Sequence, residues 1–291
     1  MTSHGTAGHG RGGPRRRRRG YPARVITNAG PDAELAVTAA RAGAAVVRAM
    51  FGTALDRVDK GGGDFATAAD LAAEKAVVEV IRAARPGDAV TGEEGGSAGP
   101  DGAGRRWLVD PLCGTLNYAA GMMAAAVNVA LRDGPGVTAA ASADPFSGEV
   151  FWTDGRRACV RAGNADSGLV PSAASRLVDV NLDPPFPNAP RFRAARLLAD
   201  EAFAGLFRPR VVSTTLAVAW VAAGRRAAYV TDGSLRDSVH FASGIALCQA
   251  AGCVVTGIDG QPLHTGAGGL IAAADHETHA ALLRMAGRAS G

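Results

Sequence analysis

The stretch that most constrains the fold of this 291-residue chain is WLVDPLCGTLNY, residues 107–118. Three apolar residues lead into Asp110, and a turn through a proline and Gly114 follows before Thr115. This order predicts a buried strand that ends in a carboxylate, then a glycine turn and the start of a helix. A carboxylate and free helix amides at a strand end can hold a metal ion and a phosphate. The thiol of Cys113, in the middle of this loop, is an unexpected group beside a hard metal ion.

Helical and extended patterns alternate through the rest of the chain. Apolar residues at helical spacing predict helices over 31–51 and from a cap at Thr67 to near Pro86. Further along, the patterns predict a helix over 191–206, a helical stretch over 214–224, a strand over 227–233, a helix over 240–251 and strands near 254 and 270. We therefore expect an α/β protein with an α+β half over 29–180 and an α/β half over 181–291.

The first 28 residues are expected to form a disordered basic tail, because they are rich in glycine and arginine and poor in apolar residues. The first twenty hold six arginines and no acid, so without them the formal net charge of +4 becomes mildly negative. We expect no nucleic-acid binding by the folded body, whereas the tail leaves that possibility open. No run approaches the roughly 18 apolar residues that span a bilayer, and we expect a cytoplasmic protein without membrane contact.

The chain has four cysteines, none of them in a CxxC pair: Cys113, Cys159, Cys248 and Cys253. A chain of this length does not need disulfide bonds to fold, so we expect free thiols in a reducing cytosol. Cys248 and Cys253 lie in the apolar stretch GIALCQAAGCVV, which favours buried structural thiols.

Four segments of the chain carry a recognisable pattern in a fixed order. They are DFATAAD (64–70), GEE (92–94), DPLCGT (110–115) and VHFASGIALCQAAG (239–252). Together they resemble the inositol monophosphatase family of Mg²⁺-dependent, lithium-sensitive sugar-phosphate phosphatases, whose motifs read roughly D-x-x-T-x-x-D, G-E-E, D-P-[IL]-D-G-T-x-N-[FY] and W-D-x-A-A-G. The resemblance runs from about residue 31 to 280. It implies a layered α-β-α-β-α fold, a small-molecule substrate and a homodimer.

The resemblance also implies the residues of a metal site. Glu93, Asp110 and the backbone carbonyl of Leu112 would hold one Mg²⁺, an ion that prefers oxygen ligands. A second ion would stabilise the leaving oxygen in a two-metal displacement at phosphorus.

The phosphate and the attacking water would meet other residues of the same motifs. Backbone amides at Gly114 and Thr115 would bind the phosphate. Asp70 would hydrogen-bond to Thr115, and the two would orient the attacking water.

The groups that should hold only the second ion are replaced. The second aspartate of D-P-x-D-G-T is Cys113, and the aspartate of W-D aligns without gaps on His240, with Val239 in place of the tryptophan. Because both positions face one ion in the family, we expect the two side chains within roughly 3 to 5 Å of each other.

One interpretation, which we take as the leading one from sequence, is a Cys–His dyad. The helix start after Cys113 would lower the thiol pKa, His240 would take the proton, and Asp237 would orient the imidazole. The amides at Gly114 and Thr115 would then form an oxyanion hole for acyl or other group transfer or hydrolysis, without a cofactor.

Three other interpretations stay open. The chain could be a metal-dependent phosphomonoesterase that runs on one Mg²⁺, or that uses Glu93, Asp110, Cys113 and His240 as a mixed set suited to Zn²⁺ or Fe²⁺. It could be a non-catalytic relative that binds a ligand through the same fold. Cys113 and His240 could also each be a plain packed residue, a buried thiol and a hydrogen-bonded imidazole.

Overall fold

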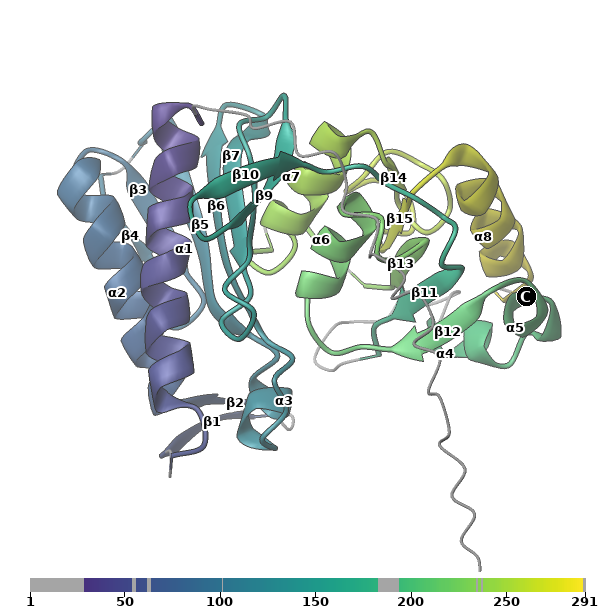
Figure 1. Ribbon diagram of the computed structural model, residues 1–291, viewed down its shortest axis with the longest axis horizontal. Coiled ribbons are helices and arrows are strands. Elements are labelled where there is room, and N and C mark those ends of the chain that lie inside the picture. Colours follow the sequence, from purple (N-terminus) through teal and green to yellow (C-terminus); the bar gives the residue numbers. More distant parts are fainter. Residues whose placement is uncertain are drawn as a thin grey trace, which may run out of the picture.

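The computed structural model describes residues 29–53, 56–61, 64–100, 102–182, 194–233, 235–236 and 238–289. The expected tail over 1–28 lies outside them. Five layers follow one another in Figure 1, helices α1 and α2, a first sheet, helices α6 and α7, a second sheet, and an outer group of helices. This arrangement confirms the layered α-β-α-β-α fold that the family resemblance implies.

The first layer consists of α1 (Pro31–Met50) and α2 (Ala68–Ala84). Pro31 suits the first turn of α1 because that turn needs no backbone donor there. At the start of α2, the Thr67 hydroxyl accepts a hydrogen bond from the Ala69 backbone, and an Asp70 oxygen accepts one from the Thr67 backbone at 2.8 Å. This reciprocal cap confirms the predicted helix start and holds Asp70 at a fixed place.

Gly43 lets α1 approach its neighbours closely. A Cβ at this position would lie 2.7 Å from Cγ2 of Val77 on α2 and 3.0 Å from Cγ1 of Val127. Gly43→Ala is therefore expected to destabilise the fold by about 1–3 kcal/mol through overpacking. Gly287 in helix α8 (His276–Ala289) is a matched control, because a Cβ added there would have no other atom within 4 Å. Gly287→Ala should instead stabilise by about 0.5–1 kcal/mol, and urea unfolding that shows equal effects would contradict the packing argument.

The first sheet has eight strands in the order β10-β9-β8-β7-β6-β5-β3-β4. In chain order they are β3 (Ala89–Gly92), β4 (Gly96–Ala98), β5 (Arg105–Cys113), β6 (Ala126–Asp133), β7 (Gly136–Ala143), β8 (Val150–Thr153), β9 (Ala158–Ala162) and β10 (Ala165–Gly168). β5 pairs with β6 in antiparallel register, which sets Asp110 opposite Asn128, and an irregularity follows between Asp110 and Cys113. A hairpin of β1 (Arg57–Gly61) and β2 (Asp64–Thr67) precedes α2.

The second sheet has five strands in the order β12-β11-β13-β15-β14. In chain order they are β11 (Leu177–Val180), β12 (Arg208–Val211), β13 (Ala228–Thr231), β14 (Val254–Thr256) and β15 (Leu270–Ala273). The expected strands near 230, 254 and 270 are confirmed. β11 lies just before the expected boundary near 180 and already belongs to this second sheet.

Helices α6 (Leu216–Ala222) and α7 (Ala242–Ala251) form the middle layer. One buried apolar cluster joins them to both sheets, through Phe151 on one side and Tyr229 on the other. The outer layer has α4 (Ala194–Leu198), α5 (Glu201–Leu206) and α8. The prediction of a single helix over 191–206 is wrong for residues 194–206, which form two helices. Asp200 breaks it, because its carboxylate accepts hydrogen bonds from the next helix's first backbone N–H groups.

Candidate functional site

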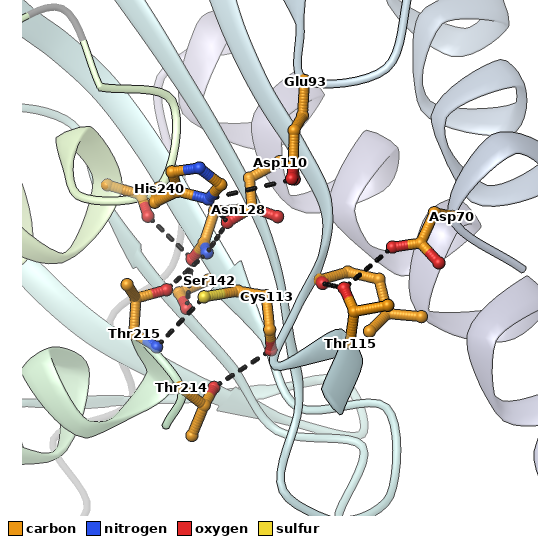
Figure 2. A network of polar contacts seen from close by, with 12 residues as sticks. Asp70, Glu93, Asp110, Cys113, Thr115, Asn128, Ser142, Thr214, Thr215 and His240 are labelled. Carbon is orange, nitrogen blue, oxygen red and sulfur yellow. Dashed lines mark hydrogen bonds and ion pairs between the residues drawn. The ribbon is translucent and has the colours of Figure 1, made fainter. Parts of the chain in front are cut away.

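Asp110 lies at the centre of the candidate site, on β5 next to its irregular end (Figure 2). Its side chain is fully buried, and Oδ2 accepts a hydrogen bond from Asn128 at 3.2 Å. Oδ1 is buried without a hydrogen-bond partner among the described residues. Burial alone would raise the pKa of Asp110, but the charge and hydrogen bond of His240 hold it below its usual range. A buried carboxylate oxygen without a donor is a costly feature that a bound cation would relieve.

Asp70 and Thr115 meet as the sequence predicts. The Thr115 hydroxyl lies 3.0 Å from Oδ1 of Asp70 and 3.0 Å from the carbonyl oxygen of Leu112. The other Asp70 oxygen is held by the cap of α2. Burial raises the pKa of Asp70, against the hydrogen bonds that favour its charged form.

Glu93 approaches Asp110 from the turn between β3 and β4. Glu74 on α2 fixes this turn, because its carboxylate accepts hydrogen bonds from the backbone N–H groups of the two residues after Glu93, at 2.8 and 2.6 Å. Burial, and then repulsion from Asp110, raise the pKa of Glu93 to about 8. Lys60 lies 3.2 Å from Oε1 of Glu93, whereas Oε2 is buried without a hydrogen bond among the described residues.

His240 and Cys113 lie close together, which confirms the predicted proximity. A ring nitrogen of His240, the Cys113 sulfur and a carboxylate oxygen of Asp110 all lie within 4.8 Å of one another. The imidazole, however, is directed at carboxylates, with Nδ1 2.9 Å from Oδ2 of Asp110 and 3.8 Å from Oε2 of Glu93 (Figure 2). The charge of Asp110 raises the pKa of His240 well above its usual value, although burial opposes this.

The expectation that Cys113 is acidic is wrong. Burial, and then the charge of Asp110, raise the pKa of the thiol to about 11, although His240 and the Thr215 amide pull it down. The helix that begins after Cys113 is α3 (Thr115–Ala119), which has five residues and so only a small dipole. The thiol is therefore protonated at neutral pH, and a nucleophile activated by His240 is not supported.

The reactivity of Cys113 should follow this pKa. Alkylation by iodoacetamide, resolved by site with mass spectrometry, is expected to stay slow at pH 7 and to rise only toward pH 11, because the thiolate is the reactive form. The urea-unfolded chain is the control, and there Cys113 should react near a pKa of about 8.5. Rapid alkylation of folded Cys113 at pH 7, lost in His240→Asn, would restore the dyad.

Gly114 and Asn117 set the course of the turn that follows Cys113. Gly114 has a φ of 103°, and a Cβ there would lie 2.7 Å from the carbonyl oxygen of Ala124. Only glycine fits this left-handed backbone and close approach. The Asn117 side chain donates hydrogen bonds to the carbonyl oxygens of Ala124 at 3.0 Å and Ser213 at 2.9 Å. The predicted phosphate contacts of the Gly114 and Thr115 amides stay a prediction.

Asn128 is a site residue that sequence reasoning missed. Its amide nitrogen donates to Asp110 and, at 2.8 Å, to the Thr215 hydroxyl. Its oxygen accepts from Ser142 at 2.8 Å and Ser243 at 2.9 Å. All the hydrogen-bonding capacity of this buried amide is thus used, and it links β5, β6 and β7 to α6 and α7. An asparagine inside an apolar strand pattern, VNVAL, was the available signal.

The loop before α6 was missed as well. The Thr215 backbone N–H donates to the Cys113 sulfur at 3.2 Å, and the Thr214 hydroxyl donates to the Cys113 carbonyl at 3.2 Å. Asp237, expected to orient His240, lies outside the described residues.

The donor set fits one Mg²⁺ and does not fit a second. Glu93 and Asp110 each offer a buried oxygen without a hydrogen bond among the described residues, and the Leu112 carbonyl lies in the same loop. These are the hard oxygen ligands that Mg²⁺ prefers. At the position of the family's second ion, Cys113 and His240 offer sulfur and nitrogen, and Mg²⁺ does not favour either of these ligand atoms.

Known proteins are similar to this chain in sequence and in fold. The model of the inositol monophosphatase family matches residues 30–289. An inositol-1-monophosphatase of Caulobacter vibrioides is 32% identical over 256 residues, which cover 85% of this chain and 97% of that protein. The structure of the extragenic suppressor protein SuhB from Bartonella henselae is similar at a TM-score of 0.74 and 25% identity, over 87% of this chain and 96% of that one. None of the helices in the described part of the chain is long and apolar enough to cross a membrane. This chain belongs to the inositol monophosphatase family.

Proposed function

We propose that the protein is a metal-dependent phosphomonoesterase that acts on an inositol phosphate or a related sugar phosphate. The observation that carries the proposal is the joint presence of the Asp70–Thr115 pair and of two carboxylates, each with a buried oxygen that accepts no hydrogen bond among the described residues. The Caulobacter relative, matched over nearly its whole length, is an inositol-1-monophosphatase. The expected homodimer and cytoplasmic location stay predictions.

The residues around the proposed Mg²⁺ position bind and orient the reactants. Glu93, Asp110 and the Leu112 carbonyl would hold Mg²⁺, which supplies positive charge against the phosphate and makes a bound water more acidic. The Thr115 hydroxyl donates to Asp70 and so presents its lone pairs to a hydrogen of the attacking water. Burial raises the pKa of Asp70, which makes its carboxylate a better acceptor for the proton that leaves that water.

Phosphate release tests the proposal directly. The purified full chain with Mg²⁺ is expected to release phosphate from inositol 1-phosphate or from one member of a panel of sugar monophosphates. Asp70→Asn should reduce kcat by about 10²–10⁴-fold, the usual contribution of a positioned general base. A folded protein that releases no phosphate from any panel member with any divalent ion would sink the proposal and favour a ligand-binding relative.

A further inference from the structure

Three side chains beside Glu93 bring together three different ligand types. The Asp110 carboxylate, the Cys113 thiol and the His240 imidazole each offer one atom, and these atoms lie within 4.8 Å of one another. Asp110 and Cys113 come from β5, while His240 comes from the segment before α7. The three side chains therefore come together only when the first sheet and the middle helix layer are packed against each other.

The chemistry of this set selects among metal ions. Thiolate and imidazole favour Zn²⁺ and Fe²⁺, whereas Mg²⁺ needs oxygen ligands in octahedral geometry. Three protein ligands leave one position of a tetrahedral ion free for water or a substrate oxygen, as in catalytic zinc sites. The His240 side chain is 28% exposed, so an ion can approach the set from the side of this imidazole.

Hydrogen bonds around the set hold its ligands in place. The Thr215 backbone N–H donates to the Cys113 sulfur at 3.2 Å, a contact that would stabilise a thiolate. Asn128 donates to Oδ2 of Asp110 at 3.2 Å, while Oδ1 is buried without a partner among the described residues. Such second contacts orient metal ligands and raise affinity in known sites.

We propose that Asp110, Cys113 and His240 bind one borderline divalent ion, Zn²⁺ or Fe²⁺, where a second Mg²⁺ does not fit. Binding displaces the thiol proton of Cys113 and the proton shared between His240 Nδ1 and Asp110 Oδ2, and both pass to solvent. The inference rests on the proposed function only for the role of the ion in turnover, because binding can be measured without a substrate.

The test measures ion binding by the full chain after chelator treatment and desalting. Zn²⁺ is titrated in competition with a chromophoric chelator, and Fe²⁺ in a parallel anaerobic arm. Co²⁺ replaces Zn²⁺ in a third arm, because a cobalt–thiolate bond gives a charge-transfer absorption that oxygen ligands do not. We expect one ion per chain, the charge-transfer band, and a loss of Zn²⁺ affinity of more than about 100-fold in both Cys113→Ser and His240→Gln.

Cys253→Ser is the matched control, since Cys253 is also a free, half-buried thiol and lies outside the set. This variant should keep the cobalt band and the Zn²⁺ affinity. No stoichiometric Zn²⁺ or Fe²⁺ binding, or equal binding by wild type and Cys113→Ser, would overturn the site. Zinc binding with no phosphate release would support the site and reject the phosphatase. Phosphate release with Mg²⁺ alone, without zinc binding, would support the phosphatase and overturn the zinc site.

Discussion

Asp110→Asn is expected to lower phosphatase activity on the order of 10³-fold, an effect of the same size as that expected of Asp70→Asn. An oxygen of Asp110 lies within 4.8 Å of the ligand atoms of Cys113 and His240, and the charge of Asp110 acts on Glu93. Asparagine keeps the size of the side chain and removes its charge, so an ion held as proposed would lose an anionic ligand. A loss of several kcal/mol of transition-state stabilisation corresponds to this factor, at about 1.4 kcal/mol for each tenfold.

The measurement compares kcat/KM for phosphate release with saturating metal. Asp133→Asn is the matched control, because Asp133 lies at the far end of β6 and is half-exposed next to Arg105. It should leave activity unchanged. Near-UV circular dichroism verifies that both variants fold. Asp110→Asn with activity within tenfold of wild type would show that the carboxylate is not a metal ligand in catalysis.

Asn128→Ala is expected to cause the largest loss of stability of the changes considered, about 3 kcal/mol. The substitution leaves the hydroxyl groups of Ser142 and Ser243 without an acceptor, and takes a donor from Thr215 and Asp110. Each buried polar group left unpaired costs about 1–3 kcal/mol, and rearrangement recovers part of the total. Asp110 also loses a contact that orients it, so metal affinity should fall together with stability.

Urea unfolding and zinc titration measure the two effects of Asn128→Ala separately. The control is Asn164→Ala, since Asn164 is exposed in the turn between β9 and β10. It should change the free energy of unfolding by no more than about 0.5 kcal/mol. A stability loss in Asn128→Ala no larger than in this control would mean that the hydrogen-bond network contributes little.

The parts that the sequence predicts well depend on neighbouring residues. Thr67 and Asp70 are three positions apart, so the cap of α2 can be read directly from DFATAAD. The loop from Asp110 to Thr115 can also be read directly, because its residues are close in sequence. The nearness of Cys113 and His240 is predictable only because the family resemblance relates two distant segments.

The parts that the sequence does not predict depend on distant groups. Asn128 gains its role from Ser142, Thr215 and Ser243, which belong to three separate segments. The helix after Cys113 suggests an acidic thiol, but burial and the charge of Asp110 decide its pKa. Neither the length of α3 nor the burial of the thiol can be read from the motif.

The turn at Gly114 has a consequence for how such a site can change over time. Its backbone course depends on the left-handed glycine and on the two carbonyl contacts of Asn117, and the side chain at position 113 takes no part in either. Amino-acid substitutions at positions 113 and 240 can therefore change the metal-ligating groups while the loop keeps its shape. If the proposed site binds its ion, a protein engineer can use these two positions alone to convert one metal dependence into another.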